Sequence, residues 1–201
     1  MSSYNGIDFN IWPESFIRPG LRIRDGWFYG DNYQNKGLVE TESKIEGAEK
    51  ELSIYLQEGY HQVDSITRLR RHTIRIDGFV SVQARLSGGE FITKPIIFEG
   101  SELVLNFSTS VPGGIKVEIQ DEIGHVIEGF SLDDCHEIWG DDLARTVKWG
   151  DTTDVSSLAG RPVRLRFFLK DADLYSIQFK GWVPYEDRLP PDQHGGGVEH
   201  S

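Results

Sequence analysis

Apolar residues recur at every second position through most of the segment between residues 69 and 173. A period of two is typical of β-strands that bury one face and expose the other. Four runs keep this alternation: Ile74, Ile76, Val80, Val82 and Ala84; Leu103, Leu105 and Phe107; Ile115, Val117 and Ile119; and Val163, Leu165, Phe167 and Leu169. The pattern predicts a series of strands, with Val117, Leu165 and Phe167 facing a core.

Short segments rich in glycine and charge separate these strands, at residues 87–90, 98–102, 111–114 and 122–125. Such segments are typical of tight turns between antiparallel strands. The sequence therefore predicts an all-β protein, with a jelly-roll-type antiparallel β-sandwich over residues 68–181. A small β-rich segment over residues 1–67 precedes the sandwich. The tail over residues 182–201 lacks periodicity, and we expect it to be disordered.

Composition narrows the range of partners. The formal net charge of the 201-residue chain is −11, which repels phosphate backbones, so we expect no nucleic acid partner. No apolar run approaches the roughly 18 residues that a membrane-spanning helix needs, so we expect no membrane partner either. The single cysteine, Cys135, excludes an intramolecular disulfide. The first residues do not resemble a signal peptide, so a cytoplasmic protein and a bacterial protein exported by another signal both remain compatible.

An acidic connection over residues 131–151 is the first candidate for chemistry. Its carboxylates could supply the oxygen ligands of a Ca²⁺ ion, although their spacing differs from that of an EF-hand. The candidate metal ligands are Asp133, Asp134, Asp141 and Asp142. The alternative is a solvated loop. We expect no catalytic residue here, because adjacent aspartates point apart, whereas a glycosidase needs two carboxylates that face each other.

Aromatic residues beside polar groups form a second candidate. Flat rings can stack on sugars while carboxylates and amides bind the hydroxyl groups. The candidate ligand-binding residues are Asp31, Asn32, Tyr33, Asp134, Trp139 and Trp149. The alternative is that these aromatic side chains close the core of the sandwich.

Residues 29–179 resemble the C-terminal end of bacterial proteins related to glycoside hydrolase families 32 and 43. The resemblance rests on the segments GLVET, ELSIY, RLRRHTIRIDGFVSV, GEFITKP, GFSLDDC, GRPVRLRF and DADLYSIQF. It implies a β-propeller that carries the catalytic carboxylates, followed by a β-sandwich. A propeller blade takes about 40–45 residues, so the residues before the sandwich suffice for one blade and a linker.

Three functions follow as hypotheses. The first is a non-catalytic accessory β-sandwich of a glycoside hydrolase-like protein, with carbohydrate as a ligand and a propeller domain or another copy as a protein partner. The second is glycoside hydrolase or lyase activity through the acidic connection. The third is a structural scaffold between domains or subunits. Solvent exposure of Trp139 and Tyr33 would favour binding, and their burial would favour the scaffold.

Overall fold

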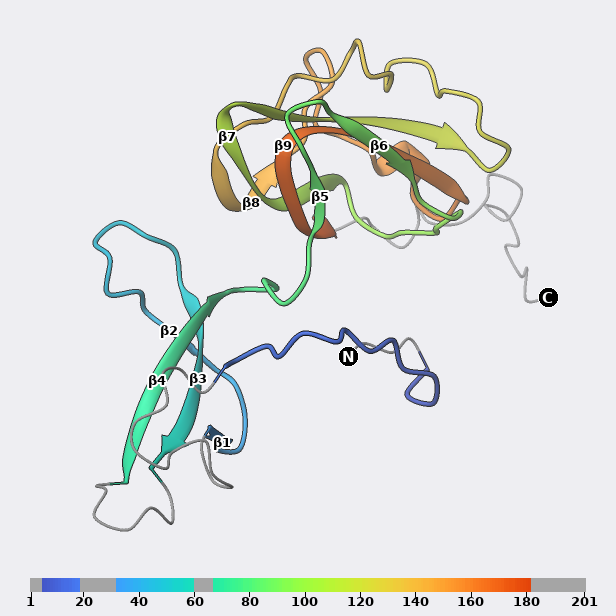
Figure 1. The fold of residues 1–201 in the computed structure, drawn as a ribbon. Helices are drawn as coiled ribbons and strands as arrows, with labels where there is room; N and C mark the ends of the chain where they lie inside the picture. Colours follow the sequence, from blue (N-terminus) through green and yellow to red (C-terminus); the bar gives the residue numbers. More distant parts are fainter. Residues whose placement is uncertain (1–4, 19–31, 60–66, 182–201) are drawn as a thin grey trace, which may run out of the picture. The chain divides into compact units, whose positions relative to one another are not determined.

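The computed structural model describes residues 5–18, 32–59 and 67–181 (Figure 1). The chain divides into two compact units, Met1–Ile76 and Asp77–Ser201, which are described separately below. Within the described residues, the only helical element is the short 3₁₀ turn η1, Ser156–Leu158. No helix in this part of the chain is long and apolar enough to span a bilayer.

The first unit holds one antiparallel sheet built around strand β3, Glu51–Glu58. Strand β4, Arg68–Arg75, pairs with β3 along its whole length. Two short strands, β1 (Tyr33–Gln34) and β2 (Val39–Thr41), pair with opposite ends of β3. Strands β1, β2 and β3 lie in the β-rich segment that the sequence predicts over residues 1–67, whereas β4 lies in the range predicted for the sandwich.

Strand β4 contains the basic sequence RLRRHTIR, and its arginines meet acidic partners on β3. Arg70 Nε lies 2.6 Å from Glu58 Oε1, and Arg71 Nη2 lies 2.7 Å from Glu51 Oε1. Arg71 also donates to Ser53 Oγ at 2.6 Å. The alternating pattern that runs through residues 74–84 predicts that residues 68–75 begin the sandwich. The structure instead pairs β4 with β3, and a turn over residues 76–79 separates it from β5.

The second unit is an all-β antiparallel sandwich, as the sequence predicts. Its strands are β5 (Val82–Ala84), β6 (Gly89–Ile92), β7 (Glu102–Asp121), β8 (Asp141–Thr146) and β9 (Val163–Lys180). The hydrogen-bonded order is β5-β9-β7-β8, and β6 also pairs with β9. Strands β7 and β9 are long, and Figure 1 shows both of them curving around the centre of the unit.

The sheet becomes two layers because β7 and β9 bend at a shared corner. Their pairing passes from Thr109↔Ala172 directly to Gly114↔Lys170, which leaves the intervening residues of β7 as a bulge. A Cβ atom on Gly113 would lie 2.5 Å from the Asp171 carbonyl oxygen, so only glycine allows this close approach. The chain therefore folds over its own sheet at this corner.

One hydrophobic core lies between the two layers. Many of its members come from the three later runs of alternating residues, and Val117, Leu165 and Phe167 are all fully buried, which confirms their predicted orientation. The first run differs, because Val80 and Val82 are 50% and 47% exposed, so their predicted inward orientation is wrong. The Phe167 ring stacks on Phe91 with centroids 4.9 Å apart. The core thus fixes which faces of β6, β7 and β9 remain available to solvent.

Candidate functional site

Trp149 belongs to the core, where it is only 1% exposed. Its indole Nε1 donates to the Val117 carbonyl oxygen at 2.8 Å, and Phe130 packs edge-on against its ring. Trp149 lies outside the named strands, so strand alternation does not determine its position. The bridges Cys135↔Trp149 and Trp149↔Thr152 fold the connection inward at this point. A buried indole cannot stack on a ligand, so Trp149 leaves the set of candidate binding residues.

Trp149 lies close to Cys135, whose thiol is also buried. Burial raises the pKa of this thiol, although the Val117 amide donates a hydrogen bond to its sulfur at 3.3 Å. A thiol with a raised pKa is a poor nucleophile. Cys135 therefore has a packing role.

The carboxylates of the acidic connection are held by local partners. Asp134 Oδ2 accepts hydrogen bonds from the Ser131 hydroxyl at 2.7 Å and from the Ser131 amide at 3.1 Å. Asp142 Oδ2 pairs with Arg145 Nε at 2.9 Å. These contacts close turns within the connection.

The aspartates also fail to converge on one point. Asp141 and Asp142 are successive residues of β8, so their side chains point to opposite sides of the strand. Among the residues that the structure describes, no three acidic, histidine or cysteine side chains gather in a way that could hold a metal ion. Asp133, Asp134, Asp141 and Asp142 do not gather in such a group, and a Ca²⁺ site in this connection stays a prediction.

Three aspartates that accept hydrogen bonds from nearby residues have lowered pKa values, with a consequence for acid stability. Hydrogen bonds from the His125 amide, from Ser131 and from the Ser156 amide hold the pKa of Asp121, Asp134 and Asp154 below the ordinary value of 3.8. A lowered folded-state pKa contributes stability that is present above the unfolded pKa and is lost as the pH falls through the folded value. We therefore expect the melting temperature to decline below about pH 4, the ordinary aspartate range.

The substitution Ser131→Ala provides the test of this assignment. Carbon NMR titration should show the pKa of Asp134 rising toward its ordinary value, because the variant lacks the hydroxyl group that donates to Asp134 Oδ2. Asp154 serves as the internal control, since its donor Ser156 is untouched. An unchanged Asp134 pKa would show that the Ser131 hydroxyl is not responsible for the shift.

The second group of candidate binding residues lies in the first unit. Asn32 adopts a positive φ of 63°, and Tyr33 begins β1 with its side chain 42% exposed. Asp31 lies outside the described residues. Asn32 and Tyr33 are thus consecutive residues at the start of β1.

Trp139 is the candidate that the structure leaves open to solvent, with 66% of its surface exposed. The chain on both sides of it is anchored to β7. Ile138 exchanges two backbone hydrogen bonds with Ile115, at 2.8 and 2.9 Å. On the other side, the Gly140 carbonyl accepts from the Thr109 amide at 2.7 Å, and the Gly140 amide donates to Thr109 Oγ1. The indole is thus exposed on a held backbone.

Glu137 is a neighbour of Trp139 that sequence reasoning did not select as a site residue. Ile138 is buried, so Glu137 and Trp139 on either side of it point away from the core. The Glu137 side chain lies directly over Gly114, where an added Cβ would come within 2.6 Å of Glu137 Oε1. The pairing of Ile138 with Ile115 places Glu137 beside Gly114, and no local sequence pattern predicts this pairing.

A polar network covers the same side of β6, β9 and β7. Arg166 Nη2 lies 2.7 Å from Glu90 Oε2, and its Nη1 lies 3.4 Å from Glu118 Oε1. Glu118 is only 4% exposed and also accepts from Gln120 Nε2 at 2.8 Å. These residues alternate with the core residues of their strands. We call this surface, with Phe168, Lys116, Glu137 and Trp139, the outer face.

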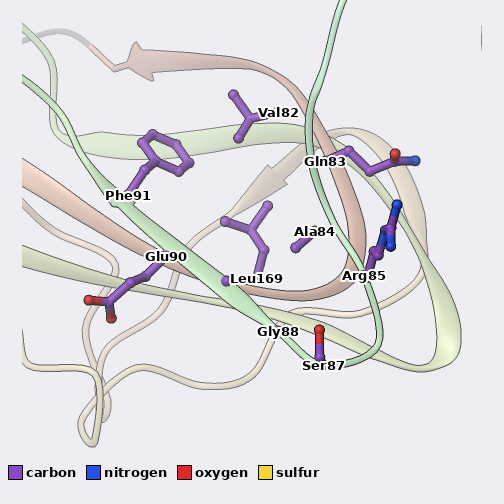
Figure 2. A pocket seen from close by; sticks show the side chains of 10 residues that line it. Val82, Gln83, Ala84, Arg85, Ser87, Gly88, Glu90, Phe91 and Leu169 are labelled. Carbon is purple, nitrogen blue, oxygen red and sulfur yellow. The ribbon is translucent and has the colours of Figure 1, made fainter.

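A hollow of about 270 Å³ lies between β5 and β6 (Figure 2). Its apolar lining includes Val82, Ala84, Phe91 and Leu169. Figure 2 shows the polar side chains of Gln83 and Arg85 directed to the other side of β5. The hollow is slightly below the roughly 300–1,000 Å³ of small-molecule sites. Gln83, Arg85, Ser87 and Glu90 also line the hollow, and we do not assign it a ligand.

Comparison with family models, curated proteins and solved structures finds no match to this chain. The fold and the site define an all-β protein with an antiparallel sandwich and an exposed tryptophan on its surface. Its function is therefore argued from the geometry of that surface.

Proposed function

We propose that this chain is a non-catalytic, carbohydrate-binding accessory β-sandwich of a glycoside hydrolase-like protein. The observation that carries the proposal is the Trp139 indole, which is 66% exposed on a backbone anchored to β7 on both sides. Exposing such a large apolar ring to water forgoes the free energy that its burial would supply. A planar ring held in place is suited to the apolar face of a sugar.

Polar groups beside Trp139 can bind sugar hydroxyls. Glu137 lies over Gly114 on the same side of the chain, and its carboxylate can accept hydrogen bonds from hydroxyl groups. Because one end of the indole is apolar and the other carries an N–H donor, the ring itself supports the same kind of amphipathic ligand. The pair therefore matches the two requirements of a sugar, stacking and hydrogen bonding.

The state of the acidic connection supports the non-catalytic part of the proposal. A general acid of a glycosidase needs a raised pKa, whereas hydrogen bonds from Ser131 lower the pKa of Asp134. The Asp142 carboxylate is paired with Arg145. Neither aspartate has the environment of a catalytic proton donor, and this weakens the alternative of a hydrolase or lyase acting through this segment.

Calorimetric titration with neutral oligosaccharides tests the proposal. We expect dissociation constants between micromolar and millimolar, about −8 to −4 kcal/mol, because the site is open to solvent. Trp139→Ala should weaken binding at least tenfold, whereas Trp139→Phe should retain part of it. Ile123→Ala is the matched control, since Ile123 is an exposed apolar residue at the turn after β7. Equal binding by wild type and Trp139→Ala would contradict the proposal.

A scaffold is the second candidate, and the first unit favours it. Several of its apolar side chains are exposed, among them Ile7 at 80%, Ile11 at 76% and Ile45 at 73%. A small four-stranded sheet buries little surface by itself and gains stability by packing against other elements. The expected partners are a propeller domain of a parent protein or another copy of the chain. Absence of heat with every glycan would favour this function.

A further inference from the structure

We propose that the ligand site extends from Trp139 across the outer face to Phe168 and takes an extended, neutral oligosaccharide. This inference rests on the proposed function and specifies its ligand. Phe168 is 39% exposed, although it directly follows the fully buried Phe167. Alternation along β9 therefore turns the Phe168 ring to the side of the sheet that Trp139 also faces.

Strand register places the two aromatic residues on one surface. Phe168 lies opposite Lys116 of β7 on one side and opposite Glu90 of β6 on the other. On the far side of β7, Ile138 lies opposite Ile115, which brings Trp139 level with Gly114. Because Ile115, Phe167 and Ile138 all face the core, their neighbours Gly114, Phe168 and Trp139 face outward.

The register also sets the distance between the two residues. Two strand spacings of about 4.8 Å and an offset of two residues of about 3.3 Å each separate their Cα atoms by roughly 12 Å. This separation exceeds the size of a single pyranose ring. A ligand that contacts both aromatic rings must therefore be a chain of linked sugars that lies across the strands.

The surface between the Trp139 and Phe168 rings is polar, and one of its residues has no side chain. Gly114 has no side chain, and Glu137 lies across it. Lys116 Nζ donates to the Leu132 carbonyl oxygen at 3.1 Å, which holds the lysine side chain in place. A sugar chain that bridges the rings would meet these groups along its length, and each of them can bind a hydroxyl.

The charges of the outer face favour a neutral ligand. Arg166 is bonded to both Glu90 and Glu118. With Lys116 and Glu137, these side chains comprise two cations and three carboxylates. Glu118 accepts further hydrogen bonds from Gln120 Nε2 and the Leu132 amide, so its position is fixed before any ligand arrives. The net charge of these named side chains is −1, which repels an acidic ligand and favours a neutral one. Ordered polar groups also reduce the entropy lost on binding.

Chain length is the variable that tests the extended site. The probes are β-1,4-linked gluco-, xylo- and manno-oligosaccharides from disaccharide to hexasaccharide, titrated into the full chain. We expect wild-type affinity to rise at least tenfold over this series. Phe168→Ala should remove the gain and leave disaccharide binding unchanged, while Phe168→Tyr should keep it. Trp139→Ala should weaken every length, and the matched control Ile123→Ala should bind like wild type.

The possible outcomes separate this inference from the proposed function. Affinity that does not change with length, or a Phe168→Ala variant that keeps the gain, would overturn the extended site alone if Trp139→Ala still loses binding. Equal or tighter binding of oligogalacturonates would overturn the neutral ligand class. No heat from wild type with any probe would overturn both proposals. Circular dichroism of each variant confirms that it is folded.

Discussion

Replacing Phe167 by alanine should lower the free energy of unfolding by about 3–5 kcal/mol, as deleting a buried aromatic ring does. The ring is fully buried, stacks on Phe91 and lies opposite Val117 in the strand register. Removing it leaves a cavity whose lining loses both dispersion contacts and burial. Denaturant titration of the full chain, followed by circular dichroism, measures the loss.

The next residue of β9 is the control for this experiment. Phe168→Ala removes the same number of atoms from a ring on the outer face, so it should cost less than about 1 kcal/mol. The contrast between these adjacent phenylalanines depends only on which face of β9 each occupies. A loss below about 1 kcal/mol for Phe167→Ala would show that its side chain does not face the core.

Trp149→Ala should also cost about 3–5 kcal/mol. This change removes a ring that is 1% exposed, its edge-on contact with Phe130, and the hydrogen bond to the Val117 carbonyl oxygen. Trp149→Phe keeps much of the volume and loses the hydrogen bond, which should cost about 1–3 kcal/mol for the unsatisfied carbonyl. The same denaturant titration measures both variants.

Trp139→Ala is the matched control for this pair. Trp139 lies just before β8 and Trp149 just after it, yet Trp139 is 66% exposed. Its removal should change the free energy of unfolding by less than about 1 kcal/mol, while it weakens glycan binding at least tenfold. Equal destabilisation by Trp139→Ala and Trp149→Ala would contradict the division of the two residues between surface and core.

Much of the fold follows from local pattern. The alternation of Leu103, Leu105 and Phe107 predicts both a strand and its buried face, and the structure confirms both. The residues of β4 show the limit of this reasoning. Their alternation continues through residue 84, but Arg68, Arg70 and Arg71 meet Glu58 and Glu51 on β3, and strand pairing follows those partners.

The candidate site was only partly predictable. Trp139 and Trp149 have similar surroundings in the sequence, rich in acidic residues and glycine, and no local pattern distinguishes them. The bridge between Ile138 and Ile115 leaves the neighbouring Trp139 exposed, whereas the bridge between Trp149 and Thr152 accompanies the burial of Trp149. Clustering in the sequence likewise suggests a Ca²⁺ site at Asp133 to Asp142. Hydrogen bonds from Ser131 and the Arg145 ion pair instead give two of these carboxylates separate partners.

The sequence by itself determined the all-β class and the inward faces of β7 and β9, because these depend on a period of two. It did not determine strand β8, Asp141–Thr146, which lies within the predicted acidic connection. Only the tertiary structure decided which residues share a surface. Gly114 is an ordinary turn residue in the sequence, yet in the fold it makes room for Glu137. Phe168 and Trp139 are separated by the whole connection from β8 to β9, and strand register alone brings them onto one face. Register arises from long-range pairing around a shared core, which no local pattern encodes.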